Sequence, residues 1–246
     1  MAPALALVLA LAASGASGES ASQASLSGDE IVARHLEAVG GTARLRALKS
    51  LRLTGRITLE AGENALEGPF VVERKRPRKS RMAAELNGMP TSQAFDGIVA
   101  WGIPLGKSSP EVVDREQTRD REVESEFDDY LLDHKARGIA VGLIGREPIG
   151  AVDAIKLSVA LKGRQMITYL DPSTYIEIRR DHLGPDGKVR DETNLSDPRE
   201  TGGLLFPTLM EITSVASGLK TLMRVSTIEL DPDIPDTRFE SPKEAR

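Results

Sequence analysis

Three histidines are the first candidates for metal binding or acid–base chemistry in this chain of 246 residues: His35, His134 and His182. They lie far apart in the sequence, and no two have the short spacing with which neighbouring ligands hold zinc. We therefore interpret them as core or solvent-facing histidines. The sequence predicts no metal site built from them.

A run of acidic residues between Glu122 and Asp129 is a second candidate site. Its carboxylates could bind calcium, but the run lacks the glycine and the regular ligand spacing of a calcium loop. The alternative is the solvated face of a helix, and the pattern favours it. A pair of carboxylates for glycoside hydrolysis stays open as an alternative, because nothing selects two acids from the rest.

Other catalytic patterns are missing from the sequence. The chain has no cysteine, which excludes a thiolate nucleophile and a disulfide framework. It has no G-x-S-x-G elbow, no phosphate loop and no dinucleotide fingerprint. We therefore predict no catalytic residues, no cofactor and no enzymatic activity, with a hydrolase as the third-ranked alternative. The net charge of −5 argues against a nucleic-acid partner.

A basic run is the most strongly charged feature of the first half of the chain. Residues 73–81 contain six basic side chains, of Arg74, Lys75, Arg76, Arg78, Lys79 and Arg81. They could meet anionic lipid head groups. The alternative is a hairpin whose edge is protected by charge.

The elements that carry these residues are mostly strands. Apolar and polar residues alternate over 51–60, and the period of two recurs in further segments. Short turns separate the segments, which predicts a meander of antiparallel strands. Helices are expected over 27–39, where Ser27 and Glu30 form a capping box, over 42–48 with Thr42 as the cap, and over 119–135. The expected strands are 51–60, 70–76, 81–86, 91–95, 98–102, 139–144, 154–162, 165–170, 175–181, 189–196, 204–213 and 221–230.

The N-terminal segment has the pattern of an export signal. Residues 1–13 are almost wholly apolar, and residues 14–25 are rich in serine, glycine and alanine. The alternative is a membrane anchor, but the apolar run is too short to cross a bilayer about 30 Å thick as a helix. We predict a signal peptide and flexible linker over 1–25 and one soluble exported domain over 26–246.

Several short motifs follow one another in a characteristic order along the chain. Lys75-Arg76-Pro77 closes a strand, Asp96-Gly97 and Trp101 follow, and Phe239 and Pro242 stand near the C-terminus. In this order and approximate spacing, over most of the chain, the sequence resembles the LolA family of periplasmic lipoprotein carriers and outer-membrane lipoprotein-sorting proteins.

The resemblance implies a fold and a function. The fold is a curved, incomplete antiparallel β-barrel covered by a few helices, whose apolar hollow holds acyl chains. We expect Leu53, Ile57, Phe70, Phe95, Trp101, Leu157 and Val159 to line that hollow. Arg76 matches the arginine that ties the helical lid shut, and Arg74 is expected to matter little.

By the same resemblance, the chain would be a non-catalytic periplasmic carrier. Its cargo would be a lipid or an acylated lipoprotein destined for the outer membrane. Transfer partners in the inner and outer membranes would follow from that activity. The alternative is a sensor or regulatory domain that reads envelope lipids.

Overall fold

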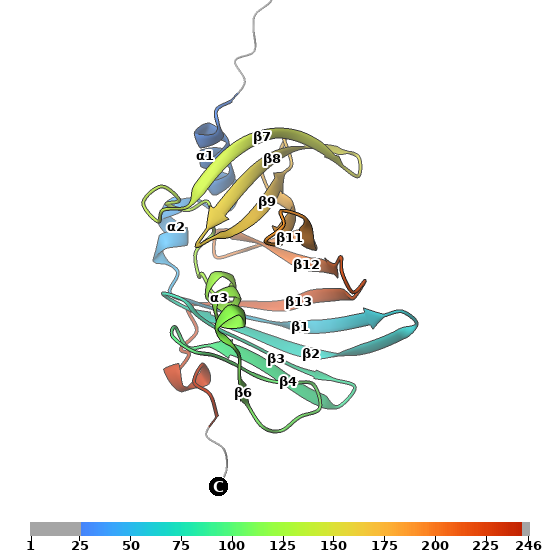
Figure 1. Cartoon of the computed structure of the whole chain (residues 1–246). Helices are drawn as coiled ribbons and strands as arrows, with labels where there is room; N and C mark the ends of the chain where they lie inside the picture. Colours follow the sequence, from blue (N-terminus) through green and yellow to red (C-terminus); the bar gives the residue numbers. More distant parts are fainter. Residues whose placement is uncertain (1–25, 243–246) are drawn as a thin grey trace, which may run out of the picture.

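All strands of residues 26–242, which this computed structural model describes, belong to one antiparallel sheet (Figure 1). The order across the sheet is β6-β5-β4-β3-β2-β1-β13-β12-β11-β10-β9-β8-β7. Strands that lie side by side in the sheet are also consecutive in the chain, except at the centre, where β1 pairs with β13. The strands are β1 Ser50–Ala61, β2 Asn64–Lys75, β3 Lys79–Leu86, β4 Met89–Phe95, β5 Ala100–Ile103, β6 Glu111–Val112, β7 Ala140–Ile149, β8 Val152–Leu161, β9 Arg164–Leu170, β10 Glu177–Leu183, β11 Val189–Thr201, β12 Leu204–Ser214 and β13 Lys220–Leu230.

The predicted fold class is confirmed: the chain is mainly β, with an open, curved antiparallel sheet and few helices. The described helices are α1 Gly28–Ala38, α2 Thr42–Ala47, α3 Arg115–Glu124 and the short 3-10 helix η1 Asp236–Arg238. None of the helices within residues 26–242 is long and apolar enough to cross a membrane. The predicted signal peptide lies outside the described residues.

The predicted helix termini are only partly correct. The capping box of α1 is present, with Ser27 and Glu30 bonded reciprocally. Gly41, not Thr42, is the N-cap of α2. The helix expected over 119–135 begins earlier, because Asp114 accepts a hydrogen bond from the backbone N–H of Gln117, and it ends at Glu124. Turns follow it up to Gly138.

One carboxylate shows that the sheet curls strongly. Arg78, in the turn after β2, donates to Glu122 Oε1 on α3 at 2.5 Å, and Lys162, in the turn before β9, donates to the same atom at 2.7 Å. In a flat sheet, the spacing of about 4.8 Å between strands would separate β2 from β9 by about 29 Å. The sheet therefore wraps round, and the face towards α3 is concave.

Two glycines allow strands to approach closely near the middle of this curve. A Cβ atom on Gly68 would lie 1.7 Å from the carbonyl oxygen of Glu85, and one on Gly55 would lie 2.0 Å from that of Arg224. Any side chain would separate β2 from β3, or β1 from β13. A ring carbon of Phe70 occupies the space above Gly55.

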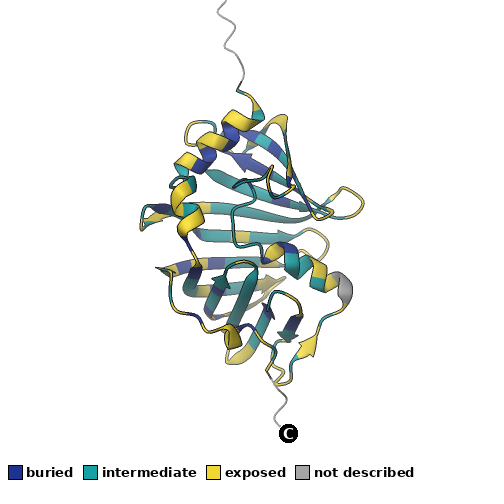
Figure 2. Cartoon of the chain, turned by 90° about the vertical axis from the view of Figure 1, so that its left-hand side faces the viewer, coloured by how far each residue is buried: buried dark blue, intermediate teal, exposed yellow. Residues whose placement is uncertain are grey.

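The concave face carries two separate apolar clusters. The first packs α1 and residues near α3 onto β8 and β9, with Ile31, Leu36, Leu157 and Val159 among its buried members. Figure 2 shows the helices in front of the sheet in this region. This cluster is a conventional helix-on-sheet core, and its central side chain, Leu157, is fully buried.

The opposite face of β1–β5 is covered by the C-terminal segment. Trp101 Nε1 donates to the carbonyl oxygen of Phe239 at 2.7 Å, and both side chains are buried. On the same face, the buried carboxylate of Glu73 accepts hydrogen bonds from Arg52, Arg81 and Arg238. The C-terminal segment is therefore held by a buried aromatic contact and a paired charge.

Candidate functional site: an apolar hollow and its lid

The second apolar cluster lies on the concave face of β1–β3, β12 and β13. Its buried members come from strands alone, and nine partly buried hydrophobic side chains surround them. The buried members are Ile57, Phe70, Ala84, Leu86, Met223 and Val225; the partly buried ones are Leu53, Leu59, Leu66, Val72, Met82, Leu105, Met210, Ile212 and Ile228. We call these fifteen residues the apolar hollow.

No helix within residues 26–242 contributes to the apolar hollow. Its only member outside the strands is Leu105, from the loop after β5. In Figure 1, β13, β1 and β2 run to the right, well beyond α3. The apolar hollow therefore keeps nine large apolar side chains partly open to solvent, an arrangement typical of a binding surface rather than of a finished core.

A second, shallow depression of about 470 Å³ lies over β2–β5. Its lining includes the paired residues Val71, Ala83, Ser92 and Ile103, which alternate with the concave-face residues of the same strands. Most of its lining therefore lies on the other face of the sheet, although Phe70 and Ala84 of the apolar hollow also belong to that lining.

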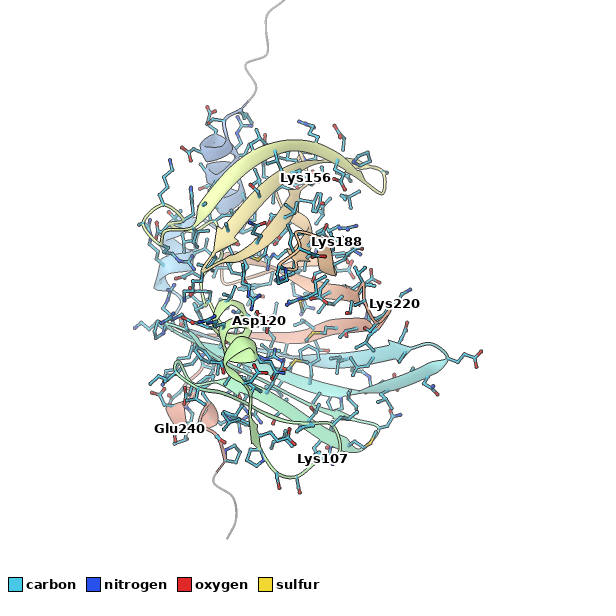
Figure 3. All side chains as sticks on the ribbon, viewed as in Figure 1. Lys107, Asp120, Lys156, Lys188, Lys220 and Glu240 are labelled. Carbon is cyan, nitrogen blue, oxygen red and sulfur yellow. The ribbon has the colours of Figure 1, made fainter. Side chains whose placement is uncertain are left out.

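A segment that includes the end of α3 lies against the concave face, beside the apolar hollow. We define the lid segment as residues 120–138, the end of α3 and the turns that follow it. Figure 3 shows Asp120 in front of the middle of the sheet, where it pairs with Arg164 and Arg190. The lid segment thus bridges both halves of the concave face through ion pairs.

Arg76 contacts both the lid segment and the end of α2. Its guanidinium donates to the carbonyl oxygens of Leu45 at 2.8 Å and Leu48 at 2.5 Å, and to Asp128 Oδ2 at 2.6 Å. It also stacks on the ring of Phe127, 4.9 Å from the centroid. One side chain thus joins β2, the end of α2 and the lid segment, and satisfies carbonyls that a helix end leaves free.

Arg74 and Arg78, two residues on either side of Arg76, also bind the lid segment. Arg74 donates to the carbonyl oxygens of Glu124 at 2.7 Å and Glu126 at 2.5 Å, and Arg78 binds Glu122. We expected Arg74 to matter little because Pro77 ends the strand. Its two contacts to the lid segment contradict that expectation, since Arg74 at the end of β2 lies on the same side as Arg76 and Arg78 in the turn that follows.

The basic and acidic runs, which the sequence presents as separate features, are partners. Arg76 pairs with Asp128, and Arg78 pairs with Glu122. Outside the basic run, Lys162 also binds Glu122 and Glu126. No group of three or more potential ligands that could hold a metal ion occurs within residues 26–242. The sequence signal that could have linked the runs is their opposite charge at similar length, but about 50 residues separate them.

A buried histidine fastens the other end of the lid segment. His35 on α1 places Nδ1 2.9 Å from the carbonyl oxygen of Tyr175 and Nε2 3.3 Å from Asp129 Oδ2. A carbonyl and a carboxylate both require an N–H, so only the imidazolium satisfies both contacts. Burial alone would lower the pKa of His35, but the hydrogen bond and charge of Asp129 outweigh it and raise that pKa. Burial opposes ionisation of Asp129, yet His35 lowers its pKa to about 2.

These shifts predict a pH dependence for the lid. The folded pKa of His35 lies above its ordinary 6.5, so this contribution to stability is complete below pH 6.5 and is lost as pH rises through the folded pKa. On the acid side it is lost as pH falls from 3.8 towards 2, as Asp129 protonates. Glu177 favours the imidazolium, and Arg180 favours the carboxylate.

We expect amide exchange in the lid segment, corrected for intrinsic pH effects, to accelerate as pH rises above 6.5. In His35→Asn, which cannot become cationic, the corrected rate should be high and independent of pH between 6 and 9. Hydrogen–deuterium exchange measured by mass spectrometry checks this. Equal pH profiles for the two proteins would contradict the ion pair.

The structure brings some of the predicted lining residues together and separates others. Leu53, Ile57 and Phe70 belong to the apolar hollow. Phe95 is buried beyond it, opposite Ser80 on β3. The remaining three, Trp101, Leu157 and Val159, lie elsewhere: Trp101 on the other face against the C-terminal segment, and Leu157 and Val159 in the core under α1.

Comparisons with known proteins agree with this architecture. No protein-family profile matches the chain, and no curated protein matches it. Among solved structures, it is similar to a LolA superfamily protein from Nitrosomonas europaea, with a TM-score of 0.62 and 14% identity over 88% of this chain and 98% of that one. A DUF1329 family protein from Desulfovibrio piger gives a TM-score of 0.62 and 14% identity, over 87% and 95%.

A third structure, a putative outer membrane lipoprotein-sorting protein domain from Vibrio parahaemolyticus, has a TM-score of 0.58 and 12% identity over 86% of this chain and 95% of that one. Together the three show that the chain has a LolA-like fold, as its motifs predicted. At these identities the likeness concerns the fold, and the function must be argued from the site.

Proposed function

We propose that this protein is a non-catalytic carrier that holds the acyl chain of a lipid or an acylated lipoprotein in the apolar hollow. The observation that carries the proposal is the apolar hollow itself, a strand-built surface of the concave face to which no described helix contributes a side chain. Transfer of acyl chains out of water gives about 0.8 kcal/mol per methylene, so such a surface needs no covalent chemistry to extract a lipid.

The lid segment supports a carrier rather than a permanent lipid store. Its buried side chains Val123, Leu131 and Leu132 pack into the first apolar cluster. Its links to the β2 side of the sheet, in contrast, are polar and come from Arg74, Arg76 and Arg78. Polar contacts of this kind exchange readily for water, whereas an apolar seal would not. The protein would then open to load cargo and close when empty.

The place of action follows from the predicted export signal. We propose that the mature protein works in the periplasm and delivers its cargo towards the outer membrane. The sorting function named for the Vibrio parahaemolyticus domain supports the second part of this proposal. Membrane-bound donor and acceptor partners would complete the route.

A binding and transfer assay tests the proposal. A fluorescent fatty acid should bind the purified protein, phospholipid should displace it, and the loaded protein should pass it to acceptor vesicles. A catalytically active protein would instead release a cleaved product, which mass spectrometry of the lipid would detect. Failure to bind any acylated probe would contradict the carrier function.

A further inference from the structure

Arg74 is a cation that binds backbone oxygens rather than a carboxylate. Both of its hydrogen bonds end on neutral carbonyl oxygens, of Glu124 and Glu126, and it forms no ion pair with any side chain that the structure describes. The carboxylates of those two glutamates bind Arg121 and Arg137 instead. Buried charges in proteins are normally paired, so an isolated guanidinium under a lid suggests an anionic ligand.

Charges of both signs surround Arg74, because the carboxylates of Glu124 and Glu126 oppose the lowering of its pKa by burial. Arg180 reaches under the lid segment, 4.9 Å from the ring centroid of Tyr130, and its charge acts with burial to lower the pKa of Arg74. His182 follows on β10, and burial together with the charges of Arg180 and Arg190 lowers its pKa to about 4. Arg180 is paired with Glu177, whereas Arg74 has no carboxylate partner of its own among the described residues.

Arg74 also stands at the end of an apolar row. On β2 the concave-face positions after Arg74, counted towards the start of the strand, are Val72, Phe70, Gly68 and Leu66. Leu53 and Met82 flank Val72 on the two neighbouring strands. At about 3.3 Å per residue, the row from Arg74 to Leu66 is about 26 Å long, enough for a long acyl chain.

We propose that Arg74 binds the anionic head group of the cargo, a carboxylate or phosphate, while the acyl chain lies along this row of β2. The inference rests on the proposed function and adds to it the chemical class of the cargo, an anionic amphiphile. A guanidinium binds such oxygens in bidentate geometry, and more strongly than it binds a neutral carbonyl.

The same geometry couples cargo to the lid. The head group and the carbonyls of Glu124 and Glu126 compete for one guanidinium, so binding of an anion frees the lid segment at this point. A neutral head group has no such advantage over the carbonyls. Anionic cargo should therefore loosen the lid near Glu126, while neutral cargo should not.

Isothermal titration calorimetry with matched probes tests this inference. The probes are palmitate, monopalmitoylglycerol, which has the same acyl chain and an uncharged head group, and acetate, which is a free anion. The wild-type protein should prefer palmitate to monopalmitoylglycerol by about tenfold, the value of one charge-assisted hydrogen bond. Arg74→Gln should remove this preference, Arg74→Lys should keep part of it, and acetate alone should not bind measurably.

Arg56→Gln is the matched control, because Arg56 is an exposed arginine paired with Glu67 on the other face of the sheet. It should keep the wild-type preference. If both acyl probes bind but Arg74→Gln keeps the preference, the head-group site is wrong while the carrier function stands. If neither acyl probe binds, the carrier function fails; if acetate binds as tightly as palmitate, the site is one for free anions.

Hydrogen exchange on the wild-type protein provides a test that needs no variant. Palmitate should accelerate exchange at residues 124–126, and monopalmitoylglycerol should not. Equal effects of the two probes would overturn the proposed competition between the head group and the lid.

Discussion

Arg76→Leu is expected to lower the free energy of unfolding by about 2–3 kcal/mol, somewhat less than the loss of a fully buried ion pair, because the pair stays partly exposed. The variant loses the hydrogen bonds to Leu45, Leu48 and Asp128 at once. Both side chains of the ion pair are about a quarter exposed, at 28% and 21%. Thermal or urea unfolding followed by circular dichroism measures this loss.

The same substitution should alter cargo transfer more than cargo binding. Arg76→Leu destabilises the empty protein, whose lid is closed, relative to the loaded protein. Closing of the lid then favours release less, so loaded protein should release cargo to acceptor vesicles about tenfold more slowly. Arg56→Leu, which removes an exposed pair, should change neither stability nor transfer appreciably. Unchanged transfer by Arg76→Leu would contradict its role in holding the lid.

Two glutamate substitutions should separate the two apolar clusters. Leu157 is fully buried under α1, so Leu157→Glu should cost about 5 kcal/mol or more and leave most of the protein unfolded. Met210 lies at the partly open surface of the apolar hollow. A glutamate there can reach water, so Met210→Glu should cost only about 1 kcal/mol.

The binding results should show the reverse pattern. Met210→Glu should stay folded and lose most of its affinity for a fluorescent fatty acid, because a charge would then lie against the acyl chain. Circular dichroism and fluorescence titration on the same samples measure both properties. A folded Leu157→Glu, or a Met210→Glu that binds as tightly as the wild type, would contradict the division of the concave face into a core and a hollow.

Much of the fold could be predicted from the sequence because it depends on local patterns. The alternation over 51–60 places Leu53 and Ile57 on one face, and the structure keeps them there. The capping box of α1 needs only Ser27 and Glu30. The end of α3 could not be predicted in this way, because it depends on contacts that Ser125 and Asp129 make with distant segments.

The position of Trp101 shows that the family resemblance and the strand pattern disagreed, since the resemblance placed Trp101 and Phe95 in one hollow. Asp96-Gly97 suggested a two-residue turn, but the loop extends over 96–99 and pairs Phe95 with Ala100. Trp101 then pairs with Ala94, on the face opposite to that of Phe95. A two-residue turn would pair Trp101 with Ser92, which shares the face of Ala94, so alternation along the two strands separates Trp101 from Phe95 in either register.

The contacts of the lid segment could be predicted only in part. The resemblance pointed to Arg76 alone, and its match to the family motif carried that expectation. Its partner Asp128 lies 52 residues away, and the contacts of Arg74 and Arg78 depend on how the chain runs after β2. Charge complementarity between distant runs is visible in the sequence, but only the fold shows which runs meet.

Photo-crosslinking tests the central claim most directly. A fatty acid with a diazirine near the end of its chain would be bound to the wild-type protein, irradiated, and its adducts located by peptide mass spectrometry. The account predicts adducts on strands β1–β3, β12 and β13, at apolar-hollow residues such as Leu66, Met82 and Met210, with strong reduction by competing phospholipid. Adducts confined to exposed sites outside the hollow, such as Leu143 and Ile144 on β7, would contradict it.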